Sequence, residues 1–348
     1  MSIKISIAPR TLHFKQPAGT SRGVYTTRQS WFVTVTDDAR PDIRGVGECA
    51  PLPDLSCDAT PNYEERLKEL CSMVEAKGSI DYDALRPYPS VLFGLETALL
   101  DLKRGGTGVL FDNSFARGEA GIPINGLVWM GNYDEMLQRL EEKMRAGFRC
   151  VKLKIGAIDF DRELDLVRHI RSAFTKEQIE LRVDANGGFT VDCALQRLEQ
   201  LAQYDIHSIE QPIRQQQWAA MAALCKATPI PIALDEELIG VNDKTEKEEL
   251  LDRIRPHYII LKPSLHGGMY GSREWIALAG KRGIGSWITS ALESNVGLNA
   301  IAQFAADVYG ESITMPQGLG TGQLFTDNIP MPLEIRGDKL WRTFKVTK

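Results

Sequence analysis

The sequence lacks the features that mark nucleic-acid-binding, membrane and secreted proteins. It has no basic tract, and its net charge of −5 argues against a surface for nucleic acid or anionic lipid. No apolar run approaches the length of a membrane span. The stretch Met1–Ser6 has no apolar core of signal-peptide length and is predicted to begin a strand. We therefore expect a cytoplasmic protein without nucleic-acid or membrane partners, and the sequence leaves its oligomeric state open.

Cysteine is present but shows no pattern. None of the six cysteines belongs to a C-x-x-C pair, which removes the usual signature of a zinc or redox site. A chain of 348 residues can bury a sizeable core and needs no disulfide staples. We interpret the cysteines as reduced thiols, in keeping with a cytoplasmic location.

Residues 1–118 are predicted to form a separate α+β unit. β-branched and aromatic residues predict strands at Ile3–Ile7, at Trp31–Thr36 and in a stretch that ends near Cys49. A loop rich in Gly, Ser and Pro is expected at Lys15–Gly23. Helical spacing of apolar residues follows at Tyr63–Lys77 and Pro89–Arg104. The polar, Gly-rich residues 105–121 then indicate a domain boundary.

From Ile122 onward, short apolar strands alternate with amphipathic helices. This rhythm is typical of βα units around a parallel sheet, and about eight units favour a closed barrel over residues 119–317. The last strand is expected at Ile313–Met315, where the apolar signal is weak. The segment Leu333–Val346 alternates loosely, and we expect it to pair with the N-terminal unit. Residues 318–348 are accordingly assigned to that unit.

Two lysines stand at alternate positions in the buried strand around Val151–Gly156. Lys152 and Lys154 therefore point to the same face of the strand. Lysine is depleted in strands and is almost never fully buried without a partner. One interpretation is an edge strand with a solvated lysine face. The other is a catalytic base, because burial beside a like charge favours a neutral lysine.

Charged residues also mark the carboxyl ends of five consecutive predicted strands: Lys154, Asp184, Glu210, Asp235 and Lys262. In a barrel these ends form one face, where active sites of this architecture lie. Three neighbouring carboxylates would repel each other unless a cation lies between them. Oxygen ligands alone favour Mg²⁺, and the absence of His or Cys at these positions argues against zinc. Taken singly, each acid could instead cap a helix or form a loop ion pair.

Further polar residues are predicted at the same face. Arg182 and Asn186 share a strand face with Asp184. Arg182 could pair with Asp184 or with substrate, and Asn186 could bind a water or brace the metal ligands, although both could also form only ordinary hydrogen bonds at the barrel mouth. The stretch Ser290–Asn295 brings polar groups to this rim after the seventh strand. The glycine-rich segment Gly318–Gln323 precedes no clear helix, so we interpret it as a turn and not as a nucleotide-phosphate loop.

These elements together resemble the enolase superfamily, and specifically its muconate-lactonizing subgroup. The resemblance covers nearly the whole chain and depends on the following stretches: Lys152–Lys154, Arg182–Asn186, Ile209–Pro212, Leu234–Glu236 and Ile260–Pro263. It implies a (β/α)7β TIM-like barrel under an α+β capping domain made from both ends of the chain. It also implies that Asp184, Glu210 and Asp235 bind Mg²⁺, with Mn²⁺ as a possible substitute. Lys154 and Lys262 would then flank the substrate, with Lys152 tuning Lys154.

Softer signals narrow the resemblance to the o-succinylbenzoate synthases of menaquinone synthesis. They are the stretches Gly47–Pro53, Ser290–Asn295 and Gly318–Phe325. The implied reaction is a Mg²⁺-dependent dehydration of a cyclohexadiene carboxylate, begun when Lys154 removes the proton next to the carboxylate. Ser290 and Glu293 would contact substrate, and Arg22, in the loop predicted to close over the mouth, is a candidate for the succinyl carboxylate.

Two other enzyme classes and one non-enzymatic class remain open on the sequence. N-acylamino acid racemases share both lysines, so residue identity does not separate them from the synthases. Dipeptide epimerases carry an Asp-x-Asp after the last strand, whereas Ile313–Gly318 has no acidic residue. A non-catalytic barrel would be expected to have lost one of the five charged strand-end residues, and none is lost here.

Overall fold

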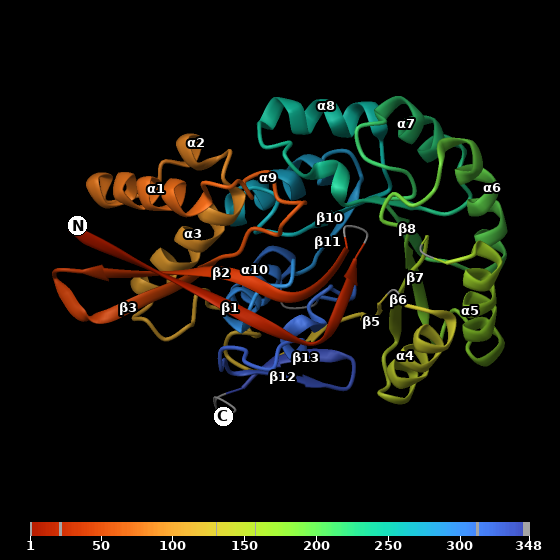
Figure 1. Ribbon diagram of the computed structural model, residues 1–348, viewed down its shortest axis with the longest axis horizontal. Helices are drawn as coiled ribbons and strands as arrows, with labels where there is room; N and C mark the ends of the chain where they lie inside the picture. Colours follow the sequence, from red (N-terminus) through yellow and green to blue (C-terminus); the bar gives the residue numbers. More distant parts are fainter. Residues whose placement is uncertain (1, 21–22, 130, 157, 311–312, 344–348) are drawn as a thin grey trace.

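The computed structural model describes residues 2–20, 23–129, 131–156, 158–310 and 313–343 (Figure 1). Arg22, the loop arginine named above, lies outside these residues. Within them, no helix is long and apolar enough to cross a membrane. All six cysteines are free thiols.

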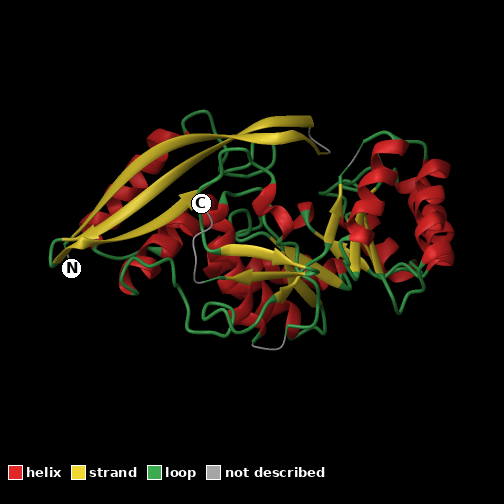
Figure 2. Ribbon diagram, turned by 90° about the horizontal axis from the view of Figure 1, so that it is seen from below, coloured by secondary structure: helices red, strands yellow, loops and turns green. Residues whose placement is uncertain are grey.

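The N-terminal region is an antiparallel sheet backed by helices. Its strands pair in the order β1-β2-β3, and its helices pack against one face of the sheet. Figure 2 shows these long strands as a layer separate from the parallel strands of the molecule. The elements are β1 (Ile3–Thr20), β2 (Gly23–Asp37), β3 (Arg40–Cys49), α1 (Tyr63–Lys77), α2 (Tyr82–Leu85) and α3 (Pro89–Lys103).

The loop expected at Lys15–Gly23 is wrong over most of its length. Pairing shifts register between His13 and Ala18, and then resumes until Thr20 lies opposite Gly23. The glycines and the proline weaken the strand signal in the sequence, but the partner strand supplies the hydrogen bonds. A long hairpin therefore stands where a loop was predicted.

The helix α3 lies directly against the backbone of β3. A Cβ atom at Gly47 would come within 1.9 Å of the carbonyl oxygen of Gly94, and one at Gly94 within 2.3 Å of Cys49 Sγ. Only glycine at both positions permits this approach. The N-terminal sheet and its main helix are thus in contact without intervening side chains.

A seven-stranded parallel sheet forms the second part of the molecule, in the order β11-β10-β9-β8-β7-β6-β5. Its strands are β5 (Gly126–Val128), β6 (Cys150–Lys154), β7 (Glu180–Asp184), β8 (Ser208–Glu210), β9 (Ile232–Leu234), β10 (Tyr258–Leu261) and β11 (Gly285–Ile288). The helices that alternate with them are α4 (Tyr133–Arg145), α5 (Phe160–Ala173), α6 (Val191–Leu201), α7 (Trp218–Ala227), α8 (Lys244–Ile254), α9 (Gly268–Gly280) and α10 (Asn295–Tyr309). Short 3-10 turns are η1 (Ala202–Tyr204), η2 (Glu236–Leu238) and η3 (Gly320–Gln323).

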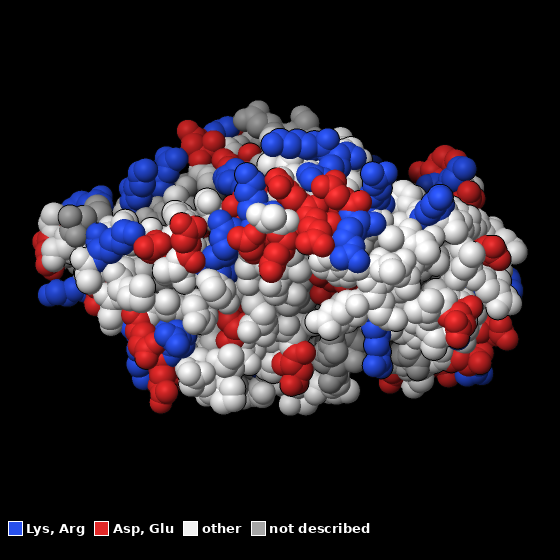
Figure 3. Space-filling model, turned by 90° about the horizontal axis from the view of Figure 1, so that it is seen from above, with Lys and Arg blue, Asp and Glu red and all other residues white. Residues whose placement is uncertain are grey.

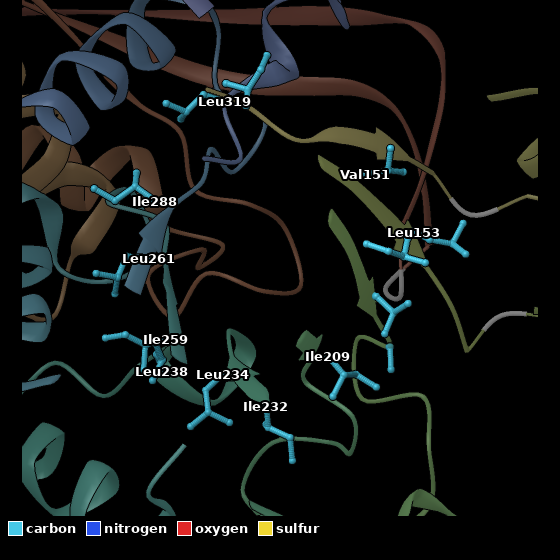
Figure 4. Close-up of a cluster of buried hydrophobic side chains, with 14 of the residues drawn as sticks. Val151, Leu153, Ile209, Ile232, Leu234, Leu238, Ile259, Leu261, Ile288 and Leu319 are labelled. Atoms are coloured by element: carbon cyan, nitrogen blue, oxygen red, sulfur yellow. The ribbon is translucent and has the colours of Figure 1, made fainter. Parts of the chain in front are cut away.

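The apolar side chains of β6 point away from the strand face that carries its lysines. In β6, Val151 and Leu153 belong to the large core shared with the helices, together with Ile209 and Ile232 of nearby strands (Figure 4). Lys152 and Lys154 alternate with them and so face the inside of the curled sheet. The interpretation of this stretch as a solvated edge strand is wrong, because β6 lies between β5 and β7 in the sheet.

The predicted eighth strand at Ile313–Met315 is not a strand in the described residues. Two isolated parallel bridges stand slightly later, from Gln317 to Ile124 and from Gly318 to Thr289. The amide of Gln317 donates to Pro123 O at 2.8 Å, and that of Gly318 donates to Ile288 O at 2.9 Å. This short segment therefore lies between residues just before β5 and residues at the end of β11 without being a full strand.

The C-terminal segment forms a hairpin of β12 (Leu333–Arg336) and β13 (Lys339–Arg342). Its partner strand is β4 (Ile122–Pro123), so the expected pairing with the N-terminal sheet is wrong for this stretch. An earlier segment makes that connection: Phe325 bridges Phe14, and the amide of Lys15 donates to Leu324 O at 2.8 Å.

Candidate active site

The five charged residues predicted at strand ends lie along one edge of the sheet. Lys154 is opposite Asp184, and Asp184 is opposite Glu210, in the paired strands β6, β7 and β8. Asp235 and Lys262 directly follow β9 and β10, which pair with each other next to β8. The sheet thus brings these residues together as the periodic sequence pattern implies.

Lysines contact all three carboxylates. Lys152 Nζ lies 2.9 Å from Asp184 Oδ2 and also binds Glu210. Lys154 Nζ lies 3.0 Å from the same Asp184 oxygen. Lys262 binds Asp235 at the other end of the row. The row is therefore a buried array in which each carboxylate contacts at least one lysine.

These contacts decide which groups are charged. Burial opposes the charge of Lys152, but Asp184 and Glu210 outweigh burial and raise the pKa of this lysine. Burial likewise opposes the charge of Lys262, and Asp235 with Glu236 outweighs it and raises the pKa of Lys262. Burial alone would lower the pKa of Lys152, and its carboxylate partners, which lie closer than the sequence could show, reverse that direction.

The oxygen atoms of the row fit a hard divalent cation. Asp235 Oδ1 is buried and has no hydrogen-bond partner in the described residues, an arrangement that calls for a bound cation or water. The donors are carboxylate oxygens throughout, the set that Mg²⁺ prefers. Across the described residues, no three acidic, His or Cys side chains are themselves arranged to enclose a metal ion. The lysine ammonium groups balance the carboxylate charges instead.

One cavity of about 560 Å³ opens onto this row. Its polar wall includes Lys152, Lys154, Asp184, Glu210 and Lys262. The hairpin β1–β2 adds Gln16 and Tyr25, and apolar surface comes from Leu55, Leu127, Trp129, Trp287 and Leu292. A wall that combines apolar side chains with convergent charged groups is typical of a small-molecule site. Figure 3 shows acidic and basic side chains mixed on one outer face, where no broad basic surface is visible.

Asn186 lies inside the site and is hydrogen-bonded to both Lys154 and Glu236. Its Oδ1 accepts a hydrogen bond from Lys154 Nζ at 2.6 Å. Its Nδ2 donates to Glu236 Oε1 at 2.9 Å, and its backbone amide donates to Asp184 Oδ1 at 3.0 Å. Glu236 also lines the cavity, although sequence reasoning passed over it as a neighbour of Asp235.

Arg182 is buried below the cavity and is not among its lining residues. Its Nε lies 2.7 Å from Glu180 Oε1, and its Nη1 donates to Pro316 O at 3.0 Å. The guanidinium stacks 4.4 Å from the centre of the Trp287 ring, which does line the cavity. Arg182 therefore supports the cavity floor, and its predicted contact with substrate stays a prediction.

The remaining predicted residues divide into two groups. Ser290 lines the cavity, with its Oγ 2.5 Å from Thr321 Oγ1. Glu293 is fully buried outside the lining, where it binds Ser264 Oγ and accepts from the Ala291 amide at 2.7 Å. Its role in substrate binding stays a prediction, as does that of Arg22.

Arg139 is a cavity residue that sequence reasoning missed. It lies in α4, and its Nη1 donates to Trp129 O at 3.1 Å, at the carboxyl end of β5. The available signal was positional: Arg139 belongs to the first helix after a barrel strand, where rim residues are common. Its charge looked like that of an ordinary solvated helix face.

Comparison with known proteins identifies the family. Residues 135–337 match the family described as enolase C-terminal domain-like, and residues 20–102 match the MenC N-terminal domain. The o-succinylbenzoate synthase of Desulfotalea psychrophila is 47% identical over 97% of this chain and 98% of its own length.

Solved structures agree with these matches. The crystal structure of MenC from Desulfotalea psychrophila superimposes with a TM-score of 0.82 at 42% identity, covering 98% of this chain and 100% of that one. A dipeptide epimerase from Enterococcus faecalis, complexed with Mg and a dipeptide, has a TM-score of 0.83 at 18% identity, covers 99% of this chain and 98% of that one, and shares the fold. The chain belongs to the enolase superfamily and, within it, to the o-succinylbenzoate synthase family.

Proposed function

We propose that this protein is a lyase that dehydrates 2-succinyl-6-hydroxy-2,4-cyclohexadiene-1-carboxylate to 2-succinylbenzoate, a step of menaquinone (vitamin K2) biosynthesis. The match to a synthase over nearly the whole of both chains supports this reaction. The single structural observation that carries it is the pair Lys154 and Lys262, which line one cavity with three buried carboxylates between them. A cytoplasmic location and a small carboxylate substrate belong to the same proposal.

The proposed architecture is a (β/α)7β barrel over residues 119–317, capped by residues 1–118 together with 318–348. The bridge of Gln317 to Ile124, just before β5, and that of Gly318 to Thr289, just after β11, support closure of the sheet. The pairing of Leu324 and Phe325 with β1 supports the contribution of the C-terminal segment to the cap.

Asp184, Glu210 and Asp235 would hold Mg²⁺, for which Mn²⁺ is a possible substitute. Bound there, the ion would stabilise the negative charge that develops on the substrate carboxylate when its neighbouring proton leaves.

In the proposed syn-elimination, Lys154 acts first as base and then as acid. Its amine removes the proton from the carbon next to the carboxylate, leaving an enediolate. The resulting ammonium then protonates the departing hydroxyl, and water and the aromatic product form together. Lys262 remains an ammonium on the other side and stabilises the enediolate. The wall of apolar residues and the β1–β2 hairpin keep bulk water from the anion.

Both lysines in one cavity also support a second candidate, racemisation or epimerisation at a carbon next to a carboxylate. An N-acylamino acid is the favoured alternative substrate, because residues 313–318 have no acidic side chain for a dipeptide ammonium.

The deciding experiment is an assay of the purified protein with the cyclohexadiene substrate. Absorbance of the aromatic product should rise with Mg²⁺ and fall to background after chelation. Absence of product would contradict the dehydratase proposal. Exchange of the α-hydrogen of an N-acylamino acid in D₂O would then support the racemase.

A further inference from the structure

Glu236 is a buried acid to which neither the metal site nor the proton transfer gives a role. It is 5% exposed, and its Oε2 has no hydrogen-bond partner in the described parts of the chain. A buried carboxyl oxygen without a hydrogen-bond partner lowers the stability of the fold, which suggests that Glu236 has another role.

The contact that Glu236 makes orients an amide. A side-chain amide has one accepting end and one donating end, whereas a carboxylate only accepts. Because Nδ2 of Asn186 donates to Glu236, the accepting Oδ1 must face Lys154, as the 2.6 Å contact shows. The backbone of Asn186 has a φ of 43°, a left-handed value that Asn and Asp tolerate best. Backbone and side chain are thus both held.

This orientation has a consequence for Lys154 as a base. A neutral lysine amine carries two N–H bonds and one lone pair. Asp184 Oδ2 at 3.0 Å and Asn186 Oδ1 at 2.6 Å offer two acceptors for those two N–H bonds. The lone pair is then left for the cavity, where the substrate proton would lie. If Asn186 were turned over, its Nδ2 would donate to the lone pair and block the base.

We propose that Glu236 is a positioning residue that, through Asn186, aims the lone pair of Lys154 at the substrate. The inference rests on the proposed function, because it assigns a task to the base of that reaction. It requires no change in metal binding or in substrate binding. Its signature is therefore a loss of kcat without a matching change of KM.

The test compares three variants with the wild type. In Glu236→Gln, the new amide can present either its oxygen or its nitrogen, so the orientation of the Asn186 amide is no longer fixed. We expect kcat to fall about 10- to 100-fold, with KM within about threefold of the wild type. In the double variant Asn186→Asp with Glu236→Gln, the new carboxylate at position 186 accepts from both Lys154 and the new amide at position 236. Net charge and the hydrogen-bond directions are restored, and kcat should recover at least about fivefold over Glu236→Gln. Asn186→Asp alone places two acids together and should be slower than the double variant.

Glu237→Gln is the matched control. Glu237 lies in the same 3-10 turn and is equally buried, but its carboxylate binds the amide of Gln216 and Gln211 Nε2, away from Lys154. Its kcat should stay within about twofold of the wild type. Thermal unfolding and the Mg²⁺ concentration for half-maximal activity are measured for every variant, so that misfolding and metal loss are seen directly.

The outcomes separate the two proposals. A Glu236→Gln enzyme with wild-type kcat, or a double variant no faster than Glu236→Gln, overturns the positioning role. The wild-type rate alone tests the dehydratase function. If the wild type racemises instead, the same ratios are measured as deuterium exchange at the α-carbon.

Discussion

The carboxylate of Glu96, in α3 of the N-terminal region, accepts a hydrogen bond from the backbone amide of Tyr270 at 2.9 Å. It also accepts from the amide of Met269, so this acid caps the first turn of α9 in the other half of the molecule. Burial nevertheless raises the pKa of Glu96 to about 8, because the two amides offset burial only in part.

Stability should therefore depend on pH through Glu96. Its pKa is higher in the folded state than the ordinary value of 4.5, so the folded state binds a proton more tightly. This contribution is complete below about pH 4.5 and is lost as pH rises toward 8, with a slope of up to about 1.4 kcal/mol per pH unit. Glu96→Gln should flatten that part of the profile of unfolding free energy, measured in urea. An unchanged slope would contradict the assignment.

Glu274 should be essential for stability because it pairs with two cations. Its carboxylate lies 2.8 Å from Arg86 Nη1 and 2.9 Å from Lys247 Nζ, and Lys247 is fully buried. Glu274→Ala leaves a buried ammonium unpaired, which typically costs about 3–5 kcal/mol. The exposed pair of Glu249 with Arg253 is the control, and Glu249→Ala should cost less than about 1 kcal/mol. Equal losses in chemical denaturation would refute this difference.

Lys154→Ala should remove the base and lower kcat by at least about 10²-fold. Mg²⁺ binding, followed by calorimetry, should persist, because Asp184, Glu210 and Asp235 remain. Lys262→Ala should also slow turnover, since the enediolate loses a neighbouring positive charge. A Lys154→Ala enzyme that still forms aromatic product at the wild-type rate would rule out this lysine as the base.

Glu210→Gln should weaken Mg²⁺ binding about tenfold or more, because a charged oxygen is replaced by a neutral amide. The effect is measured as the Mg²⁺ concentration that gives half-maximal activity and as heat of binding. Mn²⁺ should show the same weakening. Unchanged affinity for both ions would remove Glu210 from the proposed ligand set.

Arg139 lines the cavity from α4, with its Nη2 3.9 Å from Glu135 Oε2, and we predict that it contacts the second carboxylate of the substrate. Arg139→Ala should raise KM about 10-fold or more, as expected for the loss of a charged hydrogen bond. Arg145→Ala, on an exposed part of the same helix, should leave KM unchanged. Equal KM values for both variants would exclude Arg139 from substrate binding.

The sequence predicts those parts of this molecule that follow from periodicity. The βα rhythm located Asp184, Glu210 and Lys262 at strand ends, and the i, i+2 rule placed Lys152 and Lys154 on one face. Features that depend on a distant partner escaped. Gln317 and Gly318 form bridges at the sheet although the sequence around them has no apolar pattern. The proposed role of Glu236 became apparent only from its hydrogen bond with Asn186.

The bridge between Phe14 and Phe325 has a consequence for how the chain folds. The nearby contact of His13 with Asp327 joins residues 314 positions apart, so it forms only when almost the whole chain is present. During synthesis, the N-terminal hairpin must wait with its pairing edge open while the parallel sheet is made. A nascent chain halted before residue 324 would therefore leave the edge of β1 around Phe14 without its hydrogen-bond partners.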